Sequence, residues 1–197
     1  MILTFRNLAL AAALVTTTLV PKSAKADTVN LLGGETKVFL SQGFVSALGS
    51  LGVTPAAVVP SRLYKGVASF PITTGVADLV NTKVEIGHRG GLSLTAGKTK
   101  VDLLNFNIQV LDSTPVITGI VTVNGAIVGR VPLFNLAIGN VYQPNKGTLS
   151  IQNVTVTLTD AAASALNSVF SVSAFAGGFN IGTASTFTFV QPIGCEK

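Results

Sequence analysis

The stretch "PVITGIVTVNGAIVGRVPLF", residues 115–134, decides the fold class of this protein. Two runs rich in valine and isoleucine flank Asn124 and Gly125. Both of these residues accept a positive φ, which a two-residue type I′ hairpin requires at each central position. The stretch therefore predicts two antiparallel strands joined by a tight turn.

The preceding segment, "LSLTAGKTKVDLLNFNIQVL" at residues 92–111, also alternates with a period of two. It divides into two runs joined at "AGK". In the second run, Leu104, Phe106, Ile108 and Val110 share one parity, while the other parity changes from apolar residues to amides. Because residues two apart in a strand point to the same face, we expect the first set to face the core from Leu104 onward.

Strand-like runs recur along the rest of the chain, at residues 36–40, 67–72, 83–88, 147–159 and 183–190. Residues 41–52 carry apolar side chains at helical spacing after Ser41, a plausible N-cap, and residues 161–170 form a second short helix that we expect Asp160 to cap. The proline-containing residues 53–66 are expected to be an extended connection. The sequence thus predicts an all-β fold, a mainly antiparallel two-sheet β-sandwich or flattened barrel with two short helices.

The first 26 residues have the pattern of a secretory signal peptide. Arg6 precedes the short apolar run "LALAAALV", and Ala24 and Ala26 supply small residues at a cleavage site. The alternative is an N-terminal anchor that stays uncleaved. We expect a signal peptide at 1–26, a single β-sandwich domain at 27–197 with no transmembrane segment after cleavage, and an extracytoplasmic location that is secreted, periplasmic or at the cell surface.

Several function classes are disfavoured by composition. The chain from residue 27 has a small net positive charge and no basic cluster, so nucleic acid is not an expected partner. The chain has one histidine and one cysteine, Cys195, which cannot supply an internal disulfide or a usual zinc site. No G-x-S-x-G elbow occurs in the sequence. We expect no enzyme activity, no catalytic residue and no bound metal; Cys195 either links two chains or has no role.

The single histidine, His88, lies among Gly87, Gly90 and Gly91 in a strand-like run. One interpretation is structural: the imidazole donates to a backbone carbonyl and packs as a polar aromatic, while the glycines mark a bulge or tight turn. The other is functional: the missing side chains leave room for a flat ligand beside the imidazole. Haem proteins use histidine or tyrosine as axial ligands, which adds Tyr64 to the candidate ligand-binding residues.

The segment "VEIGHRGGLSLTAGKTKVDLLNF", residues 84–106, resembles the central motif of HtaA-type domains, bacterial cell-surface modules of haem uptake. "VTLTDAAASALNSVF" at 156–170 is similar to that family's threonine-rich strand and short helix, and "FAGGFNIGTAS" at 175–185 resembles its closing segment. The resemblance implies a two-sheet β-sandwich and places His88 at the family's motif histidine near the haem. The family's N-terminal motif carries a tryptophan and an iron-binding tyrosine, whereas the corresponding "SQGFVSALGSL" at 41–51 has neither.

Two hypotheses of function follow. The first is an exported, non-catalytic HtaA-like protein that binds a small apolar ligand or a cell-surface component, with the His88–Gly91 region at the mouth of a shallow apolar pocket and no cofactor. The second is a haem or tetrapyrrole binder that uses His88. The sequence leaves the oligomeric state open.

Overall fold

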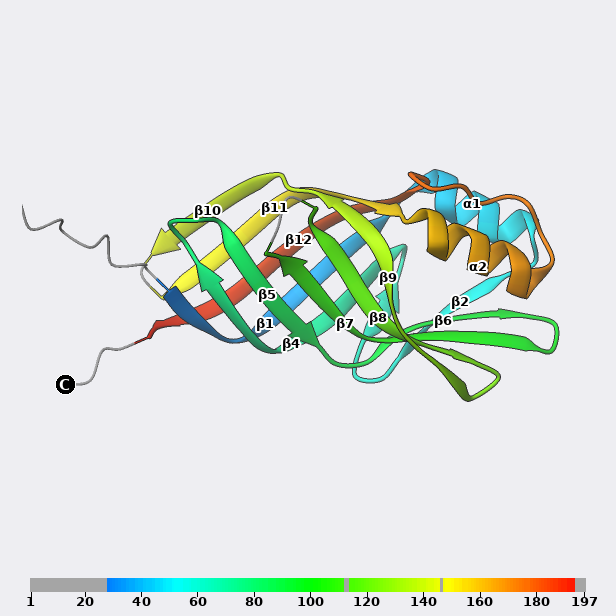
Figure 1. Ribbon diagram of the computed structural model, residues 1–197, viewed down its shortest axis with the longest axis horizontal. Coiled ribbons are helices and arrows are strands. Elements are labelled where there is room, and N and C mark those ends of the chain that lie inside the picture. The colour runs from blue at the N-terminus through cyan, green and yellow to red at the C-terminus, as the bar shows by residue number, and fades with distance from the viewer. Residues whose placement is uncertain (1–27, 112–113, 146, 194–197) are drawn as a thin grey trace, which may run out of the picture.

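The computed structural model describes residues 28–111, 114–145 and 147–193. The expected signal peptide and Cys195 lie outside these residues. The described chain folds into twelve strands and two helices (Figure 1). In chain order these are β1 (Thr28–Leu40), α1 (Gln42–Ser50), β2 (Thr54–Val58), β3 (Arg62–Tyr64), β4 (Val67–Asp78), β5 (Lys83–His88), β6 (Gly91–Ala96), β7 (Thr99–Val110), β8 (Val116–Val123), β9 (Ala126–Ala137), β10 (Asn140–Asn145), β11 (Thr148–Leu158), α2 (Asp160–Phe170) and β12 (Asn180–Pro192).

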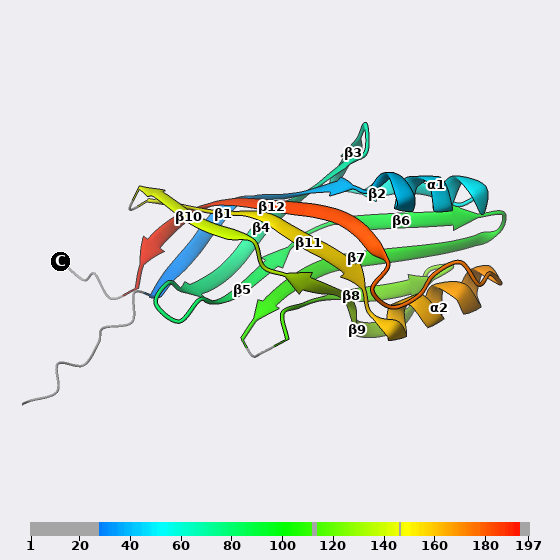
Figure 2. The same cartoon turned by 90° about the horizontal axis from the view of Figure 1, so that it is seen from above.

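The strands form a flattened, two-layered structure in which neighbours are antiparallel. Hydrogen-bonded neighbours run in the order β2-β6-β7-β5-β4-β1-β12-β11-β9-β8, and β7 also pairs with β8, so that the pairing closes on itself. Figure 2 shows β1 and β12 in one layer and β8 and β9 in the other. The predicted β-sandwich with two short helices is confirmed.

The predicted hairpin at Asn124-Gly125 joins β8 to β9. Val123 pairs with Ala126, and both turn residues have positive φ, at 50° and 84°. The turn residues therefore have the backbone conformation that the sequence demanded.

Strand β7 changes its inward face halfway along. Leu103 is buried, and so are Phe106 and Ile108, although these belong to the opposite parity. The change occurs at a β-bulge in the pairing with β8, where Asn105 has a φ of 49°. One inserted residue shifts the alternation by one place, which explains why the amides occupy the outward positions beyond it.

The two helices lie at the same end of the molecule as the tip of the β6–β7 hairpin (Figures 1 and 2). Ser41 caps α1 as predicted, because its hydroxyl accepts from the backbone N–H of Phe44. The predicted cap of α2 was wrong: Thr159 is the N-cap and accepts from Ala162, while Asp160 is the first helical residue. The expected connection at 53–66 contains the short strands β2 and β3.

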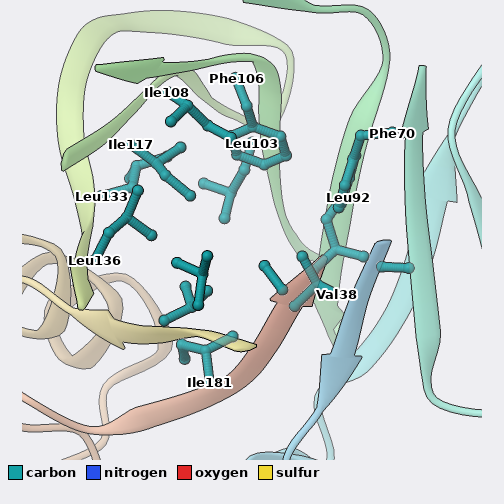
Figure 3. Packing of buried hydrophobic residues seen from close by; sticks show 14 of the residues in the cluster. Val38, Phe70, Leu92, Leu103, Phe106, Ile108, Ile117, Leu133, Leu136 and Ile181 are labelled. Carbon is teal, nitrogen blue, oxygen red and sulfur yellow. The ribbon is translucent and has the colours of Figure 1, made fainter. Parts of the chain in front are cut away.

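A continuous cluster of buried apolar side chains lies between the layers. Its side chains converge from both layers on one interior region (Figure 3). Phe70 and Phe106 meet edge to face there, with ring centroids 5.1 Å apart. No helix in the described part of the chain is long and apolar enough to span a membrane.

Candidate ligand-binding cavity

His88 ends β5 and is buried inside the sandwich, with 5% of its surface exposed. Its Nε2 lies 2.8 Å from the Thr36 hydroxyl, which in turn lies 2.9 Å from the Thr186 hydroxyl. Its Nδ1 lies 3.2 Å from the carbonyl oxygen of Phe106. The imidazole therefore connects β1, β7 and, through the two threonines, β12.

The direction of each hydrogen bond follows from the carbonyl. A carbonyl oxygen accepts only, so Nδ1 carries the proton and donates to Phe106. Nε2 is then unprotonated and accepts from the Thr36 hydroxyl, and Thr36 accepts from Thr186. The Phe106 carbonyl lies at the β7 bulge, where the regular ladder is interrupted, so His88 supplies a donor where the sheet does not.

This network suits a neutral imidazole. Burial lowers the pKa of His88 from 6.5 to about 4, and the backbone hydrogen bonds with Phe106 and Ile86 oppose that decrease only in part. The ring is therefore uncharged near neutral pH and keeps an unprotonated Nε2.

The three glycines beside His88 allow close approach of neighbouring strands. A Cβ on Gly87 would come within 2.8 Å of the Thr74 side chain, and one on Gly91 would overlap the Leu103 carbonyl of β7. Gly90, with a φ of 78°, turns the chain from β5 into β6 against the segment after β2. Glycine at these positions is explained by packing, and none of the three lines the interior cavity.

A cavity of about 360 Å³ occupies the interior between the layers. It passes the inner side of His88, Thr36 and Thr186. Nearly all of its other walls are aliphatic side chains and the rings of Phe70, Phe106 and Phe134. Figure 3 shows the side chains of Phe70, Phe106, Ile108 and Ile117 around this space. A preformed apolar space with few polar groups is the usual form of a small-molecule site.

The cavity reaches solvent at the β4–β5 turn. Thr82 and Lys83 line it there and are exposed, with Asp78 beside them. Ile138 and Val141 also line the cavity near this opening, and they are 37% and 49% exposed. The mouth is thus polar on one side and apolar on the other, and it lies away from the His88–Gly91 segment that the sequence suggested as a mouth.

The remaining sequence candidates do not gather around the cavity. Tyr64 ends β3 and is 71% exposed, with the Lys65 ammonium 5.3 Å from its ring centroid. His88 is the sequence-predicted site residue that lines the cavity. Among the described residues, no three histidine, cysteine or acidic side chains gather in a way that could hold a metal ion.

Sequence reasoning missed Thr36 and Thr186. They are 150 positions apart but are directly paired between β1 and β12, and both are buried. The available signal was parity: Thr36 shares a face with Val38 in a strand whose alternate residues are apolar. A threonine on a core-facing row signals a buried hydrogen bond, although its partner becomes clear only from the fold.

No protein-family model matches this sequence, and comparison with curated proteins finds no match either. Solved structures do match. The C-terminal domain of HtaA from Corynebacterium glutamicum has a TM-score of 0.66 at 13% identity, covering 83% of this chain and 99% of that domain. The N-terminal domain of HtaA has a TM-score of 0.61 at 10% identity, covering 82% and 98%.

The haem-binding protein HtaB from the same organism matches with a TM-score of 0.53 at 8% identity, covering 83% of this chain and 96% of HtaB. At these identities the similarity concerns the backbone arrangement, which extends over nearly the whole of each matched chain. The protein therefore has an HtaA-like fold, as its central motif suggested.

Proposed function

We propose that this protein is an exported, non-catalytic binding module that encloses a largely hydrophobic small molecule in the cavity between its layers. The observation that carries the proposal is the cavity itself, which has a volume of about 360 Å³, reaches solvent beside the β4–β5 turn and is walled almost wholly by apolar side chains. Removing apolar ligand surface from water contributes roughly 25 cal/mol per Å², and a preformed cavity lowers the ordering cost of binding. The apolar walls determine the class of ligand.

Haem or a related tetrapyrrole is the second candidate. It is supported by the HtaA-like fold, by the haem-binding description of HtaB, and by the neutral imidazole at the cavity wall. Neutral imidazole is a common haem-iron ligand.

The apolar walls of the cavity suit the porphyrin ring, but the cavity offers few groups that could bind the iron. The described residues that line the cavity include no tyrosine, cysteine or methionine, and both nitrogens of His88 are already hydrogen-bonded. Coordination through Nε2 would require the Thr36 hydroxyl to turn away. In the haem alternative, the cavity walls would hold the macrocycle and His88 would supply its iron ligand.

Binding of an environment-sensitive apolar dye such as Nile red tests the main proposal. We expect saturable fluorescence enhancement that is weakened in Ile138→Glu, because a carboxylate at the mouth must be desolvated when the ligand enters. Ile127→Glu is the matched control, since Ile127 is 76% exposed and lies outside the cavity lining. No saturable binding, or equal loss in both variants, would refute enclosure in this cavity.

Parallel titrations with haem and metal-free protoporphyrin test the alternative. If His88 binds iron, haem gives a sharp Soret band that His88→Ala abolishes, and haem binds far more tightly than the metal-free ring. If the walls alone hold the macrocycle, the two rings bind with similar affinity and Thr36→Val does not alter the spectrum. Haem spectra unchanged by the protein would remove the alternative.

A further inference from the structure

A second cavity, of about 170 Å³, lies beneath α2. Its walls come from β6, β7, β8 and β9 on one side and from α2 on the other, with Phe44 of α1 at its edge. Every side chain that lines it is Ala, Val, Leu, Ile or Phe. A space of this composition does not satisfy the hydrogen bonds of water, so it suits hydrocarbon.

The two cavities share one wall. Leu92, Phe134 and Ile181 line both of them. Leu92 and Ile181 project into the interior region seen in Figure 3. Joining the two spaces at these shared residues would need only rotamer changes of their side chains, with no strand ladder broken.

Helix α2 covers one side of the second cavity with small side chains. Ala161, Ala162 and Ala165 line the second cavity, and their small size keeps it open. The end of the helix is fixed by Asn167, whose side chain donates to the Phe175 carbonyl at 2.8 Å and accepts from the Phe175 N–H at 3.0 Å. Helix α2 is therefore held in position while its small side chains leave the second cavity open.

We propose that the two cavities form one binding path for a single-chain amphiphile. The polar head remains at the mouth beside Thr82 and Lys83, and the hydrocarbon tail passes the shared wall to end beneath α2. The polarity of the path supports this order, because polar groups line the entrance whereas the far end is purely apolar. This inference rests on the proposed function and specifies its ligand class.

Dansyl-labelled fatty acids of short and long chain provide the test. Each additional buried methylene strengthens binding about fourfold, so a long tail that enters the second cavity binds at least about tenfold more tightly than a short one. Ala165→Phe, which fills the second cavity from an exposed position on α2, removes about tenfold in affinity for the long chain and leaves the short chain unchanged. Ser164→Phe is the matched control, because Ser164 is exposed on α2 and lies outside the lining.

The outcomes separate the two proposals. If the short chain binds but the long chain gains nothing, or if Ala165→Phe leaves long-chain affinity intact, the two-cavity path is wrong while the proposed function stands. If neither chain nor Nile red binds, the proposed function itself fails. Equal weakening of both chains in Ala165→Phe also overturns the path, since it places the tail elsewhere.

Discussion

Protonation of His88 is expected to destabilise the fold in a defined pH window. The pKa is about 4 in the folded protein and 6.5 in the absence of burial. The unfolded chain therefore binds a proton at a higher pH than the folded chain does. The contribution of neutral His88 to the free energy of unfolding is complete above about pH 6.5. It decreases as the pH falls toward 4 and changes little below that value.

The magnitude follows from the two pKa values. They differ by about 2.5, and each tenfold change in proton affinity corresponds to about 1.4 kcal/mol, so the full loss of stability is about 3–4 kcal/mol, most of it above pH 4. That is a large part of the free energy of unfolding of a typical domain, which is about 5–15 kcal/mol. Asp78, whose pKa is lowered from 3.8 by hydrogen bonds from Asn81, titrates below this window and does not obscure it.

The assay uses the fact that the chain has one histidine. An NMR titration of tag-free protein gives a single imidazole signal, which should show an Nδ1–H tautomer and a pKa near 4. Urea unfolding at several pH values should give a free energy that falls by about 3 kcal/mol between pH 6.5 and 4. His88→Gln, which does not titrate, should lack that slope even if it is less stable throughout. An NMR pKa near 6.5, or equal slopes in both proteins, would refute the reasoning.

Three further predictions concern stability, each measured by urea unfolding at neutral pH. Thr36→Val leaves the His88 Nε2 without a donor and should cost about 1–3 kcal/mol; a variant as stable as the parent would contradict the assigned network. Gly91→Ala forces a Cβ into a carbonyl of β7 and should cost about 3 kcal/mol or more, whereas Gly97→Ala, where a Cβ meets open space, should cost about 1 kcal/mol for its positive φ. Thr159→Ala should cost about 1 kcal/mol and Asp160→Ala less, because Thr159 supplies the N-cap; the reverse order would show that the acid is the cap after all.

Local rules account for much of the agreement between sequence and structure. The Asn124-Gly125 turn and the Ser41 cap depend on φ and on hydrogen bonds a few residues apart, so the sequence contains the information they need. The change of parity in β7 is also visible in the sequence, and it marks the bulge at Asn105. The error at Asp160 has a local cause too, because Thr159 and Asp160 are both good caps and their order alone does not choose between them.

The candidate site was less accessible to such reasoning. The interpretation of His88 as a buried polar aromatic that donates to a carbonyl agrees with the structure. Its other partners come from strands at distant positions in the chain, and their proximity depends on how the strands close into two layers. The mouth at the β4–β5 turn is likewise a property of the assembled layers, since Lys83 carries no local sign that it borders an interior space.

The pairing of β7 with both β5 and β8 closes the ring of strands, and this closure affects the rate at which a ligand of the proposed cavity would exchange. Because the paired strands close into a ring, a ligand of the proposed cavity would enter and leave at the mouth beside the β4–β5 turn rather than between strands. Opening of that turn would then set the residence time of the ligand, whereas the apolar walls would set its affinity. Evolution could alter one without the other: a stiffer turn would slow departure while leaving equilibrium occupancy the same.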